Sequence, residues 1–271
     1  MAEIAYAEIH AFPDGDRPHS GNPAGVALLE AFLPDADLLG IAQSNNLSET
    51  AYLVKKAEAD AWDLRWFTPG CEVDLCGHAT LASGAVVFER GLVGGDRAAF
   101  DTKSGRLFVR RTGEAAYAVE FPAVPFEAAE AAPGTLAALG AAQGEVFEVE
   151  RIHGARYQMF VYASEAEIAG LNPDFSALKK TGVNVLATAR GESADVVSRF
   201  FCPDAGIDED PVTGSAHCTL APFWAGRLGR TELTARQIGP RPGALVMRAE
   251  AGNRVVLTGA AKRYLDGVIR P

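Results

Sequence analysis

The stretch Cys76-Gly77-His78-Ala79-Thr80-Leu81-Ala82-Ser83-Gly84-Ala85-Val86-Val87-Phe88 decides the fold. From Ala79 to Arg90 it is apolar nearly all round, and Gly91 stands where a helix C-cap residue is typical. A helix without a polar face is buried rather than laid on a surface. Because short strand-like runs separated by turn residues precede and follow it, we expect a strand-rich lobe wrapped around this helix.

The second half of the chain repeats this order. Arg65-Trp66-Phe67-Thr68-Pro69 precedes the first apolar helix, and Arg199-Phe200-Phe201-Cys202-Pro203 precedes a second apolar stretch at residues 216–227. Such self-similarity indicates an internal repeat. Pro222 lies inside the second stretch, and its missing N–H group predicts a kinked or shortened helix there.

These features predict an α+β fold of two similar lobes related by internal duplication. Each lobe is expected to be a mainly antiparallel, curled and barrel-like sheet around a central buried helix. We place the N-terminal lobe at residues 1–122, joined by about residues 260–271, and the C-terminal lobe at residues 123–259. The segment Pro122–Gly144, which is rich in Ala, Pro and Glu, is interpreted as the crossover between them.

Composition narrows the classes of partner. The 271 residues include 25 Lys and Arg against 35 Asp and Glu, a net charge of −10, and four Cys. An acidic chain without a basic run is poorly suited to nucleic acid or to anionic membranes. No apolar stretch is long enough to span a bilayer, and the start lacks a signal-peptide pattern. We therefore expect a cytoplasmic protein that binds a small molecule, with neither nucleic acid nor membrane as a partner.

The candidate binding sites are two helix entrances, at Gly77 and Gly214. Each entrance leaves backbone N–H groups without partners inside the helix and presents the positive end of a helix dipole. A substrate carboxylate is a suitable partner for such groups. Because both halves place polar residues at this point, we expect the two entrances to face one cleft between the lobes.

Cys76 and His78 flank the first entrance. The helix dipole is expected to favour the thiolate of Cys76. The alternative is a structural pair, a small buried hydrophobe beside a capping histidine. Glu49 begins an apolar strand, where partial burial would raise its pKa toward the range of a general acid/base. Its alternative is an exposed carboxylate at a strand end.

The second entrance carries Asp208-Glu209-Asp210-Pro211-Val212-Thr213-Gly214-Ser215. These acids could orient a substrate amine, and the Gly-Ser pair could bind its carboxylate. The alternative is a solvated acidic loop followed by a serine N-cap.

The spacing of the relevant residues does not fit nucleotide-binding or zinc-binding motifs. Gly21-Asn22-Pro23-Ala24-Gly25 lacks the glycine pattern of a dinucleotide-binding turn, and the chain has no P-loop lysine. Cys76, His78, His217 and Cys218 lack the usual spacing of zinc ligands, so we expect no metal site.

The chain resembles the PhzF-like family of phenazine-biosynthesis-like isomerases. The motifs that carry the resemblance are Gly21-Asn22-Pro23-Ala24-Gly25-Val26, Ser48-Glu49-Thr50-Ala51, Arg65-Trp66-Phe67-Thr68-Pro69, Cys76-Gly77-His78-Ala79-Thr80 and Asp210-Pro211-Val212-Thr213-Gly214-Ser215-Ala216. The resemblance implies a diaminopimelate-epimerase-type fold, a homodimer and the absence of a cofactor.

The resemblance also implies roles for individual residues. Glu49 would take a proton from one carbon and return it elsewhere on the same molecule, while His78 and Asp210 orient the substrate. The residues expected to bind the substrate and its carboxylate are Asn22, Cys76, Gly77, Thr213, Gly214 and Ser215. The expected substrate is a small carboxylate-bearing molecule, amino acid-like or dihydroaromatic.

Two alternatives remain open at this stage. Racemases and epimerases of the same fold use two thiols, one at each helix entrance. Cys76 stands at the first, but Thr213 stands at the second, and a hydroxyl is too weak an acid to replace a thiolate. A racemase using Cys76 with Glu49 is the first alternative, and a non-catalytic small-molecule binding protein is the second.

Overall fold

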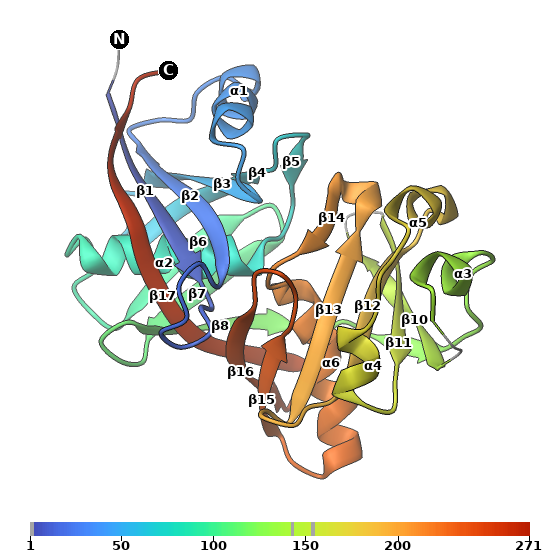
Figure 1. Cartoon of the computed structure of the whole chain (residues 1–271). Coiled ribbons are helices and arrows are strands. Elements are labelled where there is room, and N and C mark those ends of the chain that lie inside the picture. Colours follow the sequence, from blue (N-terminus) through green and yellow to red (C-terminus); the bar gives the residue numbers. More distant parts are fainter. Residues whose placement is uncertain (1–2, 142–143, 153–154) are drawn as a thin grey trace. The chain divides into compact units, whose positions relative to one another are not determined.

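The computed structural model describes residues 3–141, 144–152 and 155–271. The chain divides into two units, Met1–Phe121 with Val256–Pro271, and Pro122–Val255. The first unit thus contains both ends of the chain. Its first strand β1 (Ile4–Ala11) pairs antiparallel with the last strand β17 (Arg254–Ile269), with Ile4 opposite Ile269 (Figure 1).

The first unit is a closed sheet with two helices. Its other elements are β2 (Asn22–Leu29), α1 (Asp35–Asn45), β3 (Glu49–Lys55), β4 (Ala61–Phe67), β5 (Glu72–Val73), α2 (Gly77–Glu89), β6 (Arg97–Thr102), β7 (Gly105–Arg111) and β8 (Ala116–Pro122). Pairing runs from β1 through β2, β3, β4, β6, β7 and β8 to β17 and returns to β1. A ring of pairings without an edge is a barrel.

Two helical crossovers build this ring. α1 connects the parallel strands β2 and β3, and α2 connects the parallel strands β4 and β6. Parallel neighbouring strands require such a crossover connection, because a tight turn between two strands makes them antiparallel. Asn46 ends α1 in the left-handed conformation, with φ of 49°, and donates its N–H to the carbonyl of Ala42. The chain then enters β3 at Glu49.

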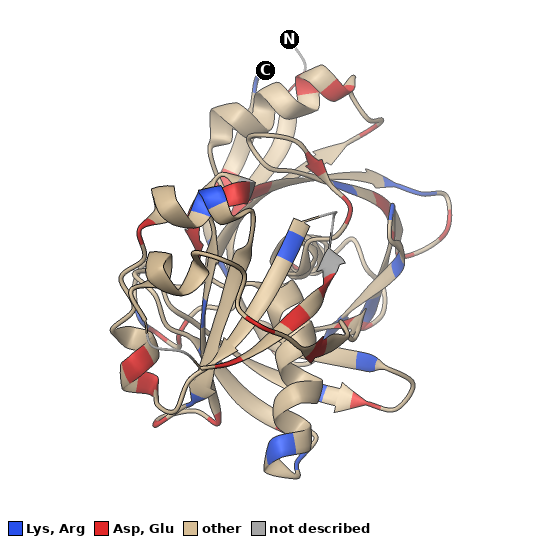
Figure 2. Ribbon diagram, turned by 90° about the vertical axis from the view of Figure 1, so that its right-hand side faces the viewer, with Lys and Arg blue, Asp and Glu red and all other residues tan. Residues whose placement is uncertain are grey.

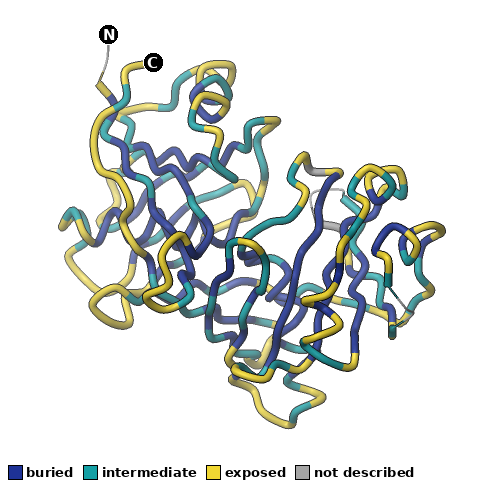
Figure 3. The backbone as a smooth tube through the Cα atoms, in the orientation of Figure 1, coloured by how far each residue is buried: buried dark blue, intermediate teal, exposed yellow. Residues whose placement is uncertain are grey.

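Helix α2 has no exposed face. All residues from Gly77 to Phe88 are buried, and the helix contacts β1, β2, β3 and β7 (Figure 3). The approach to β7 is very close, because a Cβ atom on Gly84 would lie 2.4 Å from Cγ1 of Val109. The sequence placed this helix at Ala79–Arg90, whereas it begins two residues earlier and ends at Glu89.

The second unit also combines a sheet with a few helices. Its elements are β9 (Phe126–Ala128), α3 (Thr135–Leu139), β10 (Glu145–Ile152), β11 (Ala155–Val161), α4 (Glu165–Ala169), α5 (Phe175–Thr181), β12 (Asn184–Arg190), β13 (Val196–Cys202), the 3-10 turn η1 (Pro203–Ala205), β14 (Ile207–Asp210), α6 (Gly214–Leu228), β15 (Glu232–Gln237) and β16 (Gly243–Glu250). β11 and β12 are parallel, as are β13 and β15, and the other pairings recorded within the unit are antiparallel.

Pro222 does not shorten α6, so that part of the sequence prediction was wrong. The helix continues through Pro222 to Leu228. A proline leaves the carbonyl four residues earlier without its helical donor. Here the carbonyl of Cys218 accepts the N–H of Val124 at 3.2 Å, so the segment before β9 supplies the missing hydrogen bond.

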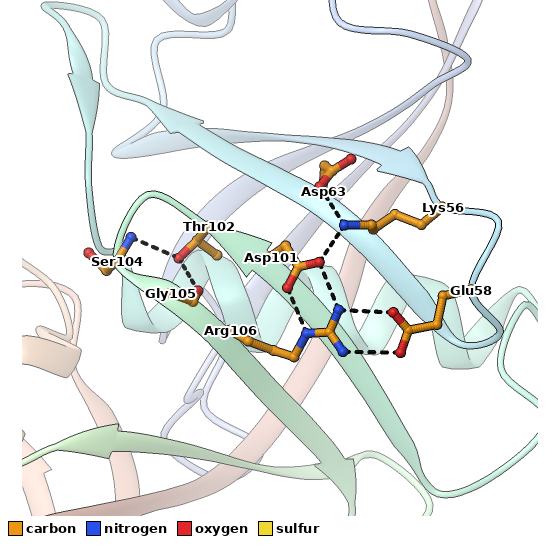
Figure 4. Close-up of polar contacts among 8 residues, drawn as sticks. All are labelled: Lys56, Glu58, Asp63, Asp101, Thr102, Ser104, Gly105 and Arg106. Carbon is orange, nitrogen blue, oxygen red and sulfur yellow. Dashed lines mark hydrogen bonds and ion pairs between the residues drawn. The ribbon is translucent and has the colours of Figure 1, made fainter.

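The α+β class and the barrel-like sheet are confirmed, in a mixed form with parallel pairs at the helical crossovers. No helix in the described part of the chain is long and apolar enough to cross a membrane. Along the ribbon, segments coloured for Lys and Arg alternate with segments coloured for Asp and Glu (Figure 2). A surface example links β6 and β7 to the segment between β3 and β4, where Arg106 binds Asp101 and Glu58 while Lys56 contacts Asp101 (Figure 4). Exposed pairs of this kind contribute little to stability individually.

The close packing of α2 predicts opposite effects of one substitution in two helices. Gly84→Ala should lower the free energy of unfolding by about 1–3 kcal/mol, because the added methyl group collides with the stiff, buried Val109. In α1, a Cβ atom added at Gly40 would have no other atom within 4 Å. Gly40→Ala should therefore raise the free energy of unfolding by about 0.4–1 kcal/mol. Urea denaturation of both variants measures the difference. Equal effects would show that α2 tolerates a wider separation from β7.

Candidate active site

The first helix entrance brings Glu49 and His78 together. Oε2 of Glu49 lies 3.0 Å from Nε2 of His78, and their side chains are 15% and 5% exposed. The angles of this contact fall outside hydrogen-bond geometry, so we treat it as an electrostatic pair. Glu49 reaches His78 because it begins β3, the strand that α2 packs against. A carboxylate and an imidazole this close can exchange a proton with a common substrate.

Asn22 connects this pair to the β2 strand. Nδ2 of Asn22 lies 3.2 Å from Nδ1 of His78, and Oδ1 of Asn22 accepts a hydrogen bond from Oγ of Ser48 at 3.0 Å. With Asn22 donating, Nδ1 is the acceptor and the proton of a neutral His78 sits on Nε2, facing Glu49. Gly21 makes the turn into Asn22 at φ of +79°, where a Cβ atom would lie 2.7 Å from the carbonyl oxygen of Ala11.

The pKa of Cys76 is raised, whereas the sequence predicted that its thiolate would be favoured. Burial, reinforced by the neighbouring Glu49, raises the pKa of the Cys76 thiol to about 11. We expected the helix dipole to favour the thiolate, but desolvation outweighs it because Cys76 is only 6% exposed. At neutral pH the group is therefore a thiol.

The protonation equilibrium of His78 is shifted toward the charged imidazolium form. Burial favours the neutral imidazole, but the acidic neighbours Cys76 and Glu49 outweigh it and raise the pKa of His78 well above the usual value. Protonation at Nδ1 would require Asn22 to present its oxygen instead of its nitrogen. The charge of His78 and the orientation of Asn22 are therefore linked.

Glu49, Cys76 and His78 also form a set of metal-ligand types, with ligand atoms within 4.8 Å of one another. Sγ of Cys76 lies 3.5 Å from Nδ1 of His78, whereas Glu49 approaches Nε2. The two acidic groups therefore face opposite nitrogens of one imidazole ring.

A bidentate ion pair fastens the loop that leads to this entrance. Arg65 on β4 donates from Nε and Nη2 to the carboxylate of Glu72 on β5, at 2.7 and 2.9 Å. Bidentate pairs of this kind fix geometry as well as add energy. The sequence motifs that contain Arg65 did not predict that its side chain holds this loop.

The second unit has its own polar group at the entrance of α6. Oγ1 of Thr213 donates to Oδ2 of Asp210 at 2.5 Å, and the N–H of Thr213 donates to Oε1 of the buried Gln237 at 2.9 Å. Nε2 of Gln237 donates to the carbonyl of Asp210, also at 2.5 Å. The structure therefore fixes Asp210 and Thr213 through Gln237, a residue that no sequence signal identified.

The α6 helix begins at Gly214 without a side-chain cap. Thr213 is the N-cap residue, so Ser215 is not the cap that the structural alternative required. Ser215 is half-buried in the first turn. One turn further on, the fully buried His217 has its Nδ1 2.7 Å from the carbonyl of Thr213, and burial lowers the pKa of His217 to about 4. His217 is thus a neutral structural residue.

Arg199 on β13 forms the counterpart of the Arg65 pair. Its Nε and Nη2 donate to Glu209 at 2.7 and 2.8 Å, and both side chains are 11% exposed. Nη1 donates to the carbonyls of Ile168 and Leu171. This satisfied, nearly buried pair holds β14 beside β13, and Asp210 directly follows Glu209.

The sequence-predicted residues therefore fall into two sets. Glu49, Cys76, Gly77, His78 and Asn22 gather at the entrance of α2 in the first unit. Asp210, Thr213, Gly214 and Ser215 stand at or just before the entrance of α6 in the second unit.

Comparison with known proteins assigns the family. The model of the phenazine biosynthesis-like protein family matches residues 9–267. An uncharacterized isomerase of Pseudomonas aeruginosa is 45% identical over 268 residues, which cover 98% of this chain and 99% of that protein. A crystal structure of a PhzF-family phenazine biosynthesis protein from Enterococcus faecalis is 42% identical, with a TM-score of 0.90 and complete coverage of both chains. The chain belongs to the phenazine biosynthesis-like family, and the enzyme class named for its relatives is isomerase.

The fold extends beyond that family. A probable proline racemase from Agrobacterium radiobacter is only 12% identical but matches with a TM-score of 0.63, covering 99% of this chain and 92% of that one. The likeness concerns the fold alone.

The pKa of Cys76 predicts selective alkylation. At pH 8 a thiol of pKa about 11 is ionised to roughly one part in a thousand, and the thiolate is the reactive form. Iodoacetamide should modify the exposed Cys71 and leave the buried Cys76, Cys202 and Cys218 unmodified, as followed by peptide mass spectrometry. Urea-unfolded protein, in which all four should react, is the control. Rapid modification of Cys76 in the folded protein would contradict the assignment.

The shift of His78 predicts a pH dependence of stability. A raised pKa gives stabilisation that is complete below the unfolded value of about 6.5 and is lost as pH rises through the folded value. Glu49→Gln removes one acidic neighbour, so the decline in unfolding free energy between pH 6 and pH 9 should become smaller than in the wild type. Urea denaturation at both pH values measures it, with Glu30→Gln, an exposed glutamate of the same unit, as the control. Identical declines in the wild type and Glu49→Gln would show that the pair does not influence His78.

Proposed function

We propose that the protein is a cofactor-independent isomerase that moves a proton within a small carboxylate-bearing substrate, amino acid-like or dihydroaromatic. The observation that carries the proposal is the 3.0 Å contact between Glu49 and His78 at the entrance of a buried helix. The isomerase class of its relatives is consistent with it.

Glu49 is proposed as the single acid/base group. Removing a proton from one carbon and returning it to another requires a group that acts in both directions. A carboxylate that is 15% exposed exchanges its proton with water less readily than an open one, which favours return of the same proton. His78, held by Asn22, orients Glu49 and balances its charge while the carboxylate is ionised.

The remaining residues are proposed to bind substrate. The N–H groups of the first turns of α2 and α6, at Gly77 and Gly214, suit a carboxylate, and Ser215 adds a hydroxyl. Asp210 is proposed to orient a donor group of the substrate. Thr213 is proposed to act mainly through its hydrogen bond to Asp210.

We further propose that the two units arose by duplication, each with a helix at its centre. The support is the repeated topology, in which β4–α2–β6 corresponds to β13–α6–β15 and both strand pairs are parallel. The ion pairs Arg65–Glu72 and Arg199–Glu209 occur at matching places.

The second candidate function is a racemase that uses Cys76. Its support is the position of Cys76 beside Glu49 and His78. Against it stand the raised pKa of Cys76 and the hydroxyl, rather than thiol, of Thr213 at the second entrance. A non-catalytic binding protein is the third candidate, and the test below separates all three.

Proton transfer predicts exchange of substrate hydrogen with solvent. The protein is incubated in D2O with α-amino acids and dihydroaromatic amino acids, and loss of C–H signals is followed by proton NMR. Glu49→Gln should slow exchange about 10²-fold to 10⁴-fold, as expected for loss of a general acid/base. Glu30→Gln should leave it unchanged, and Cys76→Ala should reduce it less than about tenfold because a thiol takes no part in the transfer.

The other outcomes are equally specific. Exchange that survives in Glu49→Gln and disappears in Cys76→Ala would support the racemase and overturn the glutamate mechanism. Binding of the same compounds without any exchange would support the binding protein.

A further inference from the structure

A small cavity on the first unit is lined by basic side chains. Its volume is about 190 Å³, and of the nine described residues that line it three are Arg or Lys, two are His and none is Asp or Glu. The whole chain has only 25 Lys and Arg in 271 residues and is acidic. A cavity lined by one sign of charge attracts ions of the other sign. The basic residues that line it are His10, Arg17, His19, Lys262 and Arg263.

One wall of the cavity is formed by β1 and β17, which lie side by side (Figure 1). His10 pairs directly with Lys262, so both side chains lie on the same face of the sheet. The register shifts between Glu8 and Ile9, which leaves Tyr264 as an extra residue in β17. Such a bulge redirects a side chain, and the Tyr264 ring stacks on the His10 ring with centroids 4.8 Å apart. Nε2 of His10 in turn lies 3.1 Å from Oε1 of Glu8. The wall therefore combines a cation with a fixed aromatic ring.

The other wall is the loop between β1 and β2, residues 12–21, whose shape is fixed by hydrogen bonds within it. Oγ of the buried Ser20 accepts the N–H of Asp14 at 3.0 Å and donates to the carbonyl of Arg17 at 2.7 Å. The N–H of Arg17 donates to the carbonyl of Asp14 at 3.1 Å. Pro13 and Pro18 restrict the backbone further. A wall that is already ordered loses little conformational entropy when a ligand binds.

Two cations of the cavity are left without a partner in the protein. Arg263 is neutralised by Glu89, with Nη2 2.9 Å from Oε2. The exposed side chains of Arg17 and Lys262 have no ion pair or hydrogen bond with any residue of the described ranges. The two aspartates of the loop do not line the cavity. Two positive charges, one from each wall, are therefore available to a ligand.

The cavity is separate from the candidate active site. Successive strand residues point to opposite faces, so His10 shares a face of β1 with Tyr6. Tyr6 packs with Leu38 and Ile41 of α1, which lies outside the barrel that encloses α2. None of the residues that gather at the α2 entrance lines the cavity. A ligand bound here would therefore not occupy the place of the substrate.

The size and charge of the cavity select the ligand. A volume of about 190 Å³ is several times the roughly 30 Å³ of a water molecule, but smaller than the roughly 300 Å³ at which pockets for whole small molecules begin. A guanidinium offers paired donors and an ammonium offers a compact charge, and both suit the oxygens of a phosphate. A phosphate monoester carries close to two negative charges at neutral pH, which match the two unpaired cations.

We propose that this cavity is a phosphate-binding site, which takes inorganic phosphate or the terminal phosphate of a small phosphorylated metabolite. Arg17 and Lys262 bind the phosphate oxygens from the two walls, and Tyr264 closes one side. The site goes beyond the proposed function and does not depend on it, because none of these residues takes part in proton transfer.

Calorimetric titration at constant ionic strength measures the Kd of inorganic phosphate and of glycerol 3-phosphate. The wild type should bind one equivalent of at least one of them. Arg17→Gln and Lys262→Gln should each weaken that binding about tenfold, as expected for the loss of a hydrogen bond to a charged group. The variant with both substitutions should bind neither compound.

The matched controls are Arg110→Gln and Lys179→Gln. Each removes an exposed cation that has no ion pair among the described residues and does not line the cavity, so the net charge changes by the same amount. Each should change the Kd less than about twofold. Equal weakening by the controls would show general attraction of anions and overturn the proposal.

Thermal unfolding separates binding from the general effect of salt. Phosphate stabilises proteins through its exclusion from their surface, and this part of the rise in Tm should be the same in the wild type and the double variant. The additional rise that binding causes should occur only in the wild type. Equal rises in both proteins would contradict the site.

The remaining outcomes are also decisive. Absence of binding of both compounds up to about 10 mM would overturn the proposal. Binding that is unchanged in Arg17→Gln and Lys262→Gln would place the phosphate elsewhere, such as at a helix entrance, and would overturn it too. Tighter binding of glycerol 3-phosphate would support a phosphorylated metabolite as the occupant, and tighter binding of inorganic phosphate would support the free anion.

Discussion

Enclosure of α2 is the constraint on which the first unit depends. A helix that is apolar all round is stable in water only when other elements cover every side of it, and the strands around α2 leave Gly77 to Phe88 buried. Enclosure has a chemical consequence. The first turn of the helix, with its unpaired N–H groups and positive dipole end, is also withdrawn from bulk water. Polar residues near that point interact in a medium that screens charge weakly.

The pKa values of both titratable neighbours of this entrance are raised, but for different reasons. Desolvation dominates at Cys76 and keeps it a thiol, whereas at His78 the adjacent acids overcome desolvation. In the same environment the carboxylate of Glu49 lies 3.0 Å from the imidazole of His78.

Much of this could be inferred from sequence. The apolar stretch after Cys76 predicted a buried helix, and the motifs around Glu49 and His78 identified residues that do meet at the α2 entrance. Predictions from the sequence were wrong or incomplete where groups far away in the sequence make the decisive hydrogen bonds. Pro222 does not interrupt α6, because the N–H of Val124 satisfies the carbonyl of Cys218 from outside the helix. Gln237, which fixes Thr213 and Asp210, lies 24 residues beyond Thr213 in a strand with no distinctive motif.

The sequence by itself determined the class of fold and the residue types at each helix entrance, because hydrophobic pattern and turn chemistry are local properties of the chain. Only the tertiary structure decided the ionisation of Cys76 and His78 and the linkage of Asn22 to His78. These properties depend on burial and on which distant groups come within a few ångströms. Residue order does not specify them until strand register and helix packing bring those groups together.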